Sequence, residues 1–168
     1  MRLSTKLRLL FWALLLGGGA ALSLYFDRKD PRLFDPFYHL ITALLSLPLL
    51  FIAFKAAALG GKTLAKYGKS ADTPPLETDR LVTQGVYGCM RHPMLFGLAL
   101  FPLGTALLLG IPTFIWPVAP LEALLIILLT LTYEEKEAIS KFGHSYEEYR
   151  KRVKAFDLRC FFRYLLNL

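Results

Sequence analysis

Four long apolar windows alternate with polar segments along the chain. They run from Leu9 to Phe26, Phe37 to Phe54, Pro93 to Gly110 and Pro112 to Tyr133, and the only charged side chain inside them is Glu122. Each window is close to the roughly 20 residues that a helix needs to cross about 30 Å of hydrocarbon. The pattern predicts an all-α fold, an integral membrane bundle of four transmembrane helices (9–26, 37–54, 93–110 and 112–133) in one membrane domain, residues 1–168.

The composition supports this reading. Of 168 residues, 55% are hydrophobic and 20% are charged, which excludes a soluble enzyme, a disordered chain and a disulfide scaffold. The net charge of +7 could suggest nucleic acid. The basic residues lie at the ends of the apolar windows, however, and this indicates a membrane surface and no nucleic-acid partner.

The distribution of Lys and Arg predicts the orientation. The N-terminal tail has three, the polar loop 60–92 has five, and the segment from Lys136 to Arg163 has eight. The connection between the first two windows has three, offset by three Asp. By the positive-inside rule, both termini and the loop 60–92 are cytoplasmic, and the expected location is a bacterial inner membrane.

The first window has an alternative interpretation. Basic residues precede a short apolar run, and the small residues Gly17 to Ala21 follow it, as in a secretory signal. Its removal would leave the loop 60–92 cytoplasmic. Cys89 and Cys160 would face a reducing compartment in either case, so no disulfide is expected. An activated thiolate at Cys89 would need a base that the sequence does not define.

The C-terminal segment 134–168 is expected to form a cytoplasmic or interfacial helical cap. The fourth helix should continue to Phe142 and end at Gly143, a common residue after a helix C-terminus. Ser145 and Glu148 have the spacing of a capping box that would start another helix. The last residues, from Phe161 to Leu166, are amphipathic enough to lie at the bilayer interface.

Two polar motifs are expected to meet at the cytoplasmic edge of the membrane. Only Gly110 and Ile111 separate the third and fourth windows, which predicts a tight helical hairpin. The hairpin brings Arg91-His92-Pro93, where the third helix begins, close to Glu134-Glu135, where the fourth helix leaves the membrane. The sequence therefore predicts a site between these motifs.

The chemistry of the two motifs is complementary. Arg91 is a permanent cation, His92 can titrate, and Pro93 suits the first position of a helix. Glu134 and Glu135 lie near the negative end of a helix dipole, which favours a nearby cation: Arg91, Lys136 or an ammonium group of a ligand. The alternative is that the two motifs form no functional site. In that case Arg91 only anchors the chain at the membrane edge, His92 is an interfacial residue, and the two glutamates are solvated.

The remaining polar candidates are less informative. Glu122 lies near the middle of the fourth window, where it should be protonated or face a polar cavity. It could line an acceptor pocket or bond to backbone groups freed by Pro117 and Pro120. His39 and His144 are expected to be structural, and no metal site is indicated.

Together the motifs carry a family resemblance. The segment from Leu81 to Gly97, followed by Glu134-Glu135, Phe142-Gly143 and the stretch from Tyr146 to Tyr149, resembles the isoprenylcysteine carboxyl methyltransferase family, with its related phospholipid and small-thiol methyltransferases. The resemblance covers roughly residues 81–156. It implies a membrane methyltransferase that binds S-adenosylmethionine at the cytoplasmic end of the hairpin.

The resemblance also implies residue roles. Tyr87, His92, Pro93 and Gly97 would shape the cofactor pocket, and Glu134 and Glu135 would hold its polar groups. Arg91 and His92 are the expected catalytic residues, with Arg91 orienting or neutralising the acceptor. The implied partners are membrane lipid and a lipophilic or small-molecule methyl acceptor, a carboxylate, thiol or amine. The sequence does not indicate the oligomeric state.

Three positions depart from the family pattern. Leu95 stands where a Tyr is usual, Gly88 where a basic residue is frequent, and His144 where an acidic residue is common. These differences concern the substrate class more than the reaction. Two other functions stay open: an NAD(P)H-dependent membrane reductase, because sterol reductases have a similar Arg-His motif, and a non-catalytic four-helix protein whose basic tail binds anionic headgroups.

Overall fold

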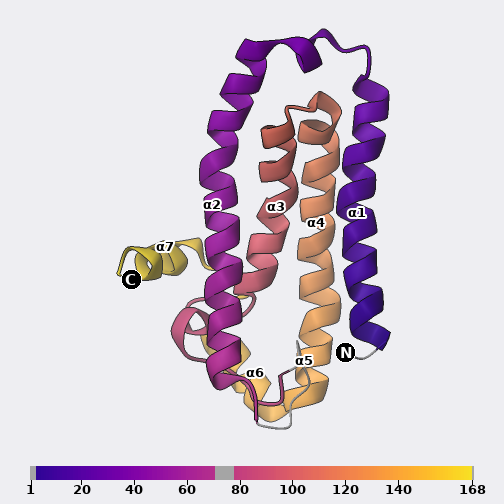
Figure 1. Ribbon diagram of the computed structural model, residues 1–168. Coiled ribbons are helices and arrows are strands. Elements are labelled where there is room, and N and C mark those ends of the chain that lie inside the picture. Colours follow the sequence, from indigo (N-terminus) through magenta and orange to yellow (C-terminus); the bar gives the residue numbers. More distant parts are fainter. Residues whose placement is uncertain (1–2, 71–77, 168) are drawn as a thin grey trace. The chain divides into compact units, whose positions relative to one another are not determined.

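The computed structural model describes residues 3–70 and 78–167, and every regular element in these ranges is helical. This confirms the all-α prediction. The elements are α1 (Leu3–Asp27), η1 (Pro31–Phe34), α2 (Pro36–Tyr67), η2 (Gly85–Gly88), α3 (Pro93–Leu109), η3 (Phe114–Val118), α4 (Ala119–Leu129), η4 (Thr130–Glu134), α5 (Glu135–Phe142), α6 (His144–Arg152) and α7 (Leu158–Leu166). Figure 1 shows their order along the chain.

The chain divides into two compact units. Unit 1 contains Met1–Phe54 and Leu98–Ile126, and unit 2 contains Lys55–Gly97 and Ile127–Leu168. Helices α2, α3 and α4 each contribute residues to both units. The two motifs predicted to form the site both belong to unit 2.

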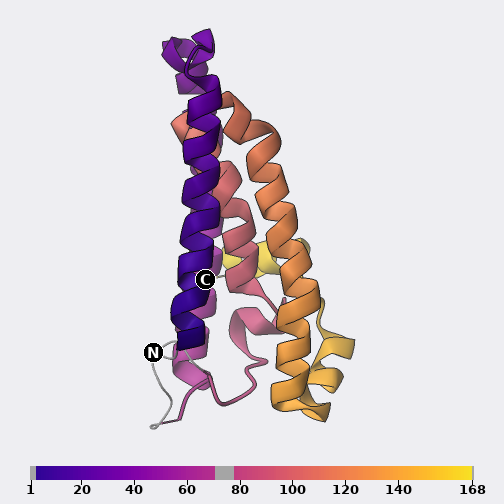
Figure 2. The ribbon, with the colours of Figure 1, turned by 90° about the vertical axis from the view of Figure 1, so that its right-hand side faces the viewer.

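In unit 1, α1 packs against the start of the fourth apolar window. The Asp27 carboxylate at the end of α1 accepts a hydrogen bond from the backbone N–H of Thr113 (2.6 Å) and another from the Thr113 hydroxyl. Ala106, Phe114 and neighbouring residues form a small buried core. Figures 1 and 2 show that η1 joins α1 to α2 at one end of this unit.

His39 has the structural role that we expected. Its Nε2 lies 2.8 Å from the backbone oxygen of Leu33. Its ring also lies against Gly110, which has a positive φ of 63°. A Cβ at Gly110 would come within 2.3 Å of His39 Nδ1, so glycine is required here both by the backbone conformation and by the space.

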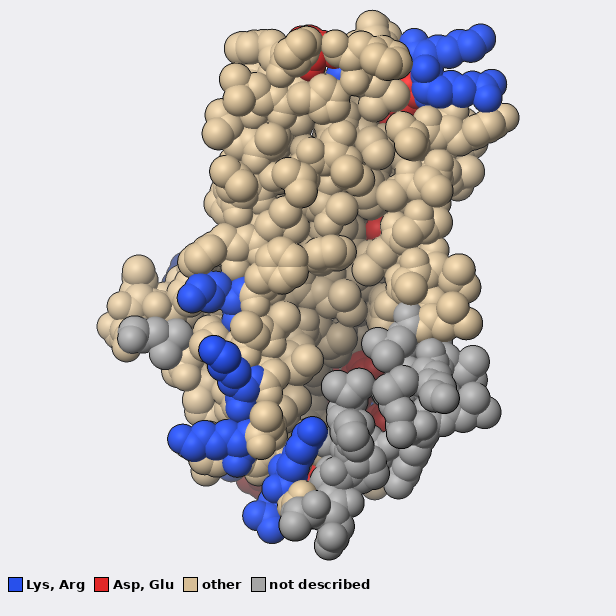
Figure 3. All heavy atoms as spheres, in the orientation of Figure 1, with Lys and Arg blue, Asp and Glu red and all other residues tan. Residues whose placement is uncertain are grey.

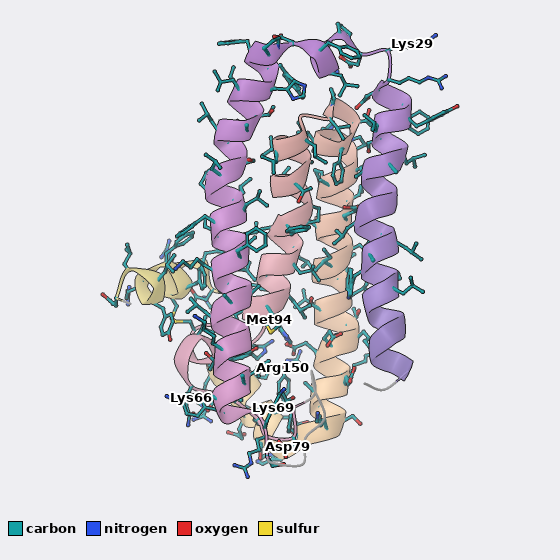
Figure 4. The ribbon with its side chains drawn as sticks, in the orientation of Figure 1. Lys29, Lys66, Lys69, Asp79, Met94 and Arg150 are labelled. Carbon is teal, nitrogen blue, oxygen red and sulfur yellow. A yellow bond between two sulfur atoms is a disulfide. The ribbon has the colours of Figure 1, made fainter. Side chains whose placement is uncertain are left out.

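Within residues 3–70 and 78–167, three helical stretches are long and apolar enough to span a membrane: Leu10–Asp27, Pro36–Tyr67 and Phe114–Phe142. Helix α3 is apolar but has only 17 residues. On the face of unit 1 seen in Figure 3, uncharged residues cover most of the helices, and Lys and Arg gather at the turn that carries Lys29, labelled in Figure 4. Many large apolar side chains of these helices are exposed, as hydrocarbon contact requires.

Two expected boundaries differ from the structure. Helix α2 continues to Tyr67, so the loop expected from residue 60 begins later. A glycine costs a helix only about 1 kcal/mol, and Gly60 lies against Met94 and Pro93 at the start of α3, where a Cβ would come within 2.6 Å of Met94 Cγ. The capping box at Ser145 is wrong, because α6 begins at His144 after Gly143 and no side chain caps it.

The fourth window is helical but kinked. Trp116 has an extended backbone (φ −150°, ψ 117°) inside the segment Phe114–Val118. It precedes Pro117, and a residue before proline is disfavoured in the helical region. The helix resumes at Ala119 and runs to Phe142 through a π-helical segment, Thr130–Glu134.

The expectation that the cysteines stay unpaired is wrong for this structure. A disulfide joins Cys89, just after η2, to Cys160 in α7, with their Cα atoms 5.3 Å apart. The prediction relied on a reducing compartment and not on distance. The fold of unit 2 brings together two residues that are 71 positions apart in sequence.

Candidate functional site

Unit 2 brings the two predicted motifs together. Pro93 is the first residue of α3, where its missing N–H is tolerated and its fixed φ suits a helix. Arg91 and His92 come just before it. Glu135 follows the π-helical segment Thr130–Glu134, which turns the residues after it by about 100° relative to an uninterrupted α-helix.

A single carboxylate oxygen is the centre of the site. Glu135 Oε1 lies 2.6 Å from His92 Nε2, 2.9 Å from Arg91 Nε and 2.8 Å from Arg91 Nη2. The Tyr146 hydroxyl also donates to it, at 3.1 Å. Since an ionised carboxylate only accepts, His92 carries its proton on Nε2, and the lone pair of a neutral imidazole is on Nδ1. The Glu135 side chain is only 3% exposed.

The other oxygen of Glu135 is buried and less well satisfied. None of the described residues donates a hydrogen bond to Oε2. Arg150 Nε lies 3.3 Å away, within ion-pair distance but without hydrogen-bond alignment, and its side chain is 53% exposed. Figure 4 labels Arg150, which reaches Glu135 from α6. Oε2 is therefore able to accept a hydrogen bond from a ligand.

Arg91 is held on every side by the protein. Its Nε and Nη2 contact Glu135, and its Nη1 donates to the backbone oxygens of Val153 and, at 3.3 Å, of Arg150. Its side chain is 8% exposed. The guanidinium therefore joins Glu135 to the end of α6. The predicted contact of Arg91 with an acceptor stays a prediction.

Backbone hydrogen bonds attach the C-terminal segment to the same motif. The N–H groups of Arg91 and His92 donate to the carbonyls of Lys154 (3.0 Å) and Ala155 (3.3 Å). The Tyr149 hydroxyl donates to the carbonyl of Tyr87 at 2.5 Å. The segment that follows α6 therefore lies directly against the Arg-His-Pro motif.

Burial determines the protonation states outside the apolar helices. Burial, together with the nearby Arg91, lowers the pKa of His92 below its ordinary value, although Glu135 opposes this. Burial also raises the pKa of Tyr146 to about 12, with the Glu135 carboxylate acting in the same direction. Tyr146 therefore keeps its proton, and the neutral form of His92 is favoured. Burial likewise raises the pKa of Tyr87 and Tyr149.

The structure distinguishes the two predicted carboxylates. Glu135 is in the cluster, whereas Glu134 is half-buried on the preceding helix position. Tyr87 is buried in η2, and Gly97 is buried within α3. His144, which was expected to be structural, is 81% exposed and faces Glu147 and Glu148, outside this cluster.

Sequence reasoning missed three participants. Tyr146 and Arg150 contact Glu135 directly, and the Phe156 ring lies 6.3 Å from the His92 ring. A signal for Tyr146 existed, because Tyr146 and Tyr149 are three residues apart on one side of a short helix, and both are buried. The exposed, basic Arg150 gave no such signal. Among the described residues, no group of three His, Cys, Asp or Glu could hold a metal ion.

Comparison with known proteins decides the family. The model of the phospholipid methyltransferase family matches residues 38–147, which include η2, the Arg-His-Pro motif, α3, Glu135 and Tyr146. The chain belongs to the phospholipid methyltransferase family. This confirms the methyltransferase family that the two motifs predicted.

Two proteins that are similar to this family member are also named as methyltransferases. The protein-S-isoprenylcysteine O-methyltransferase of Schizosaccharomyces pombe is 39% identical over 75 residues, 44% of this chain and 30% of that protein. The solved eukaryotic intramembrane Ras methyltransferase, an isoprenylcysteine carboxyl methyltransferase, has a TM-score of 0.62 at 19% identity. That similarity covers 94% of this chain and 54% of the other.

The family model establishes the family, and the solved structure establishes the fold. The chain spans 30% of the length of the first relative and 54% of the length of the second. The described part of the chain has three helices able to span a bilayer, and its structural neighbour is an intramembrane protein. This family member is therefore an integral membrane protein.

Proposed function

We propose that the protein is an S-adenosylmethionine-dependent methyltransferase that acts at the cytoplasmic edge of the membrane on a lipophilic or small acceptor. The observation that carries the proposal is the asymmetry of Glu135. Four protein donor atoms meet at Oε1, while Oε2 is buried and accepts no hydrogen bond from the described residues.

This asymmetry fits the methyl donor. S-adenosylmethionine has an ammonium group and ribose hydroxyls, and either can donate to a carboxylate oxygen. Arg91, His92 and Tyr146 fix the orientation of Glu135, so Oε2 is already in place before a ligand arrives. Tyr87 and Gly97 are proposed to line the pocket with Pro93, and Glu134 is proposed to hold a second polar group.

The residues of the chain also suit methyl transfer. When bound, S-adenosylmethionine supplies a methyl group on a positively charged sulfur, which an electron-rich acceptor displaces directly. Aligning the two groups and excluding water are the main contributions of the protein. An anionic carboxylate or thiolate needs no base. An amine would release a proton, and His92 Nδ1 carries the lone pair that can accept it.

The relatives indicate the kind of acceptor. One is named for isoprenylcysteine and the other for Ras, in both cases a methyltransferase for a lipid-modified protein. A lipophilic acceptor could reach the site from the bilayer, while the methyl donor arrives from the cytoplasm. The same proposal includes four membrane-spanning helices, with α3 added to the three long apolar stretches. It also includes the C-terminal cap of residues 134–168 and a location in a bacterial inner membrane.

The experiment is titration calorimetry of S-adenosylmethionine with the purified protein in detergent. We expect Glu135→Gln and His92→Ala to weaken binding by tenfold or more, since each removes part of the preorganised carboxylate. Glu147→Gln, an exposed carboxylate on α6, is the matched control and should bind like the wild type. Wild-type affinity in both site variants would remove these residues from the cofactor site.

A second measurement tests the reaction. Tritiated S-adenosylmethionine should label a component of a membrane lipid and protein extract only when the wild-type protein is present. Binding of a nicotinamide cofactor without binding of S-adenosylmethionine would favour the reductase alternative. Binding of neither would favour the non-catalytic alternative.

A further inference from the structure

Helix α7 presents two parallel stripes of different chemistry. Leu158, Phe162 and Leu166 are spaced four residues apart and are 50%, 39% and 85% exposed. Arg159 and Arg163, also four apart, form the neighbouring stripe and are exposed. Residues at this spacing share one side of a helix. An apolar stripe beside a basic stripe is typical of a helix that lies at a membrane interface.

The helix is held firmly with these stripes outward. The Phe161 side chain is fully buried, and its ring lies 5.6 Å from that of Phe96. The Cys89–Cys160 disulfide attaches the same turn of α7 to the segment before the Arg-His-Pro motif. Figure 1 shows α7 running across the direction of residues 55–67 of α2, within the same unit.

A pocket lies beside the basic stripe. It has a volume of about 510 Å³ and is lined by Lys154, Phe156, Asp157, Leu158, Arg159, Cys160 and Arg163. Three of these side chains are cationic and one is anionic. The anion is already engaged, because the Asp157 carboxylate accepts the Cys160 N–H at 3.0 Å and lies 3.9 Å from Lys154 Nζ. The pocket therefore has an excess of positive charge.

We infer that α7 and this pocket bind the headgroup of an anionic phospholipid of the surrounding membrane. Lys154, Arg159 and Arg163 would contact the phosphate, and Leu158, Phe162 and Leu166 would insert among the acyl chains. The basic stripe of α7 matches the anionic headgroup, and the neighbouring apolar stripe matches the acyl chains. A free anion would use only the basic stripe and would leave the exposed apolar stripe unexplained.

The test is native mass spectrometry of the detergent-purified protein with dioleoylphosphatidylglycerol, and separately with dioleoylphosphatidylcholine. The variant is Arg159→Gln/Arg163→Gln. The control is Lys151→Gln/Arg152→Gln, which removes two exposed basic residues from α6 outside the pocket. Thermal unfolding in detergent checks that both variants are folded. No methyl donor is added, so the outcome does not depend on the proposed function.

The wild-type protein should retain phosphatidylglycerol in preference to phosphatidylcholine. A basic residue near an anionic surface contributes about a fivefold gain in affinity, so the α7 variant should lose phosphatidylglycerol by tenfold or more and the control by less than twofold. Equal loss in both variants, or equal retention of the two lipids by the wild type, would overturn the site. Displacement by excess inorganic phosphate alone would show a simple anion site and overturn the lipid assignment.

Discussion

Glu135 and His92 are separated by 43 positions, yet Glu135 Oε1 lies 2.6 Å from His92 Nε2. The contact is completed by Arg91 from the same motif as His92. The His92 imidazole and the Arg91 guanidinium therefore both contact one buried oxygen of the Glu135 carboxylate, so these three groups form one cluster. Removing any of them changes the electrostatics of the other two.

Replacing Glu135 by Ala should destabilise the protein. Arg91 is 8% exposed, and a buried cation that loses its carboxylate costs about 3 to 5 kcal/mol. Thermal or denaturant unfolding in detergent measures the loss. Glu147→Ala, on the exposed side of α6, should change stability by less than about 0.5 kcal/mol. Equal stability of the two variants would mean that Arg91 does not depend on Glu135.

The free energy of unfolding should decrease when the pH is lowered, because His92 titrates. Its pKa is lowered in the folded protein, chiefly by burial, so below the ordinary histidine pKa of about 6.5 the unfolded chain binds the proton more readily. The free energy of unfolding therefore decreases as pH falls from about 7 towards the lowered pKa. His92→Gln keeps an N–H donor but does not titrate, so its stability should depend less steeply on pH. An unchanged pH slope in this variant would contradict the assignment.

The apolar windows were sufficient to predict the helices, because their hydrophobicity is a property of each segment alone. The site was only partly predictable. From the sequence, Glu134 and Glu135 were both predicted to bind the cofactor. Adjacent helix residues, however, point in directions about 100° apart. The π-helical segment Thr130–Glu134 helps to determine which of the two glutamates faces His92, and no sequence pattern predicted this segment.

The remaining differences come from contacts between distant segments. Gly60 alone resembles a helix end, but it lies inside α2 at a close contact with Met94. The guanidinium of Arg91 donates to the backbone carbonyls of Arg150 and Val153 at the end of α6, which are 59 and 62 positions away in sequence. The pairing of Cys89 with Cys160 likewise depends on where α7 docks, which charge and hydropathy do not encode.

Gly19→Ala in α1 should destabilise the protein by about 1 kcal/mol, because the nearest atom is the end of the flexible Glu122 side chain, which must move. A Cβ at this position would lie 2.0 Å from Glu122 Oε1 and 3.1 Å from Val118 Cγ1. Gly17→Ala is the matched control on the same helix, since no described atom lies within 4 Å of its Cβ. The control should be neutral or stabilising by up to about 1 kcal/mol through helix propensity. Unfolding in detergent compares the two.

The contact between Gly19 and Glu122 can be separated from a general effect on α1 by a double-mutant cycle. Glu122→Ala removes the carboxylate that the new methyl group would meet, so Gly19→Ala should cost less in that background. The same cost in both backgrounds would show that the crowding arises from Val118 or from the helix backbone, and not from Glu122.

The disulfide between Cys89 and Cys160 should contribute to the stability of the protein. It links two segments that are 71 positions apart in sequence, and a link of this kind typically stabilises a fold by about 2 to 4 kcal/mol. Both cysteines of the purified protein should therefore resist a maleimide until a reductant is added. Cys160→Ser, which cannot form the bond, should unfold at a lower temperature in detergent, and a reductant should not lower that temperature further. Labelling of both cysteines without prior reduction would contradict the disulfide.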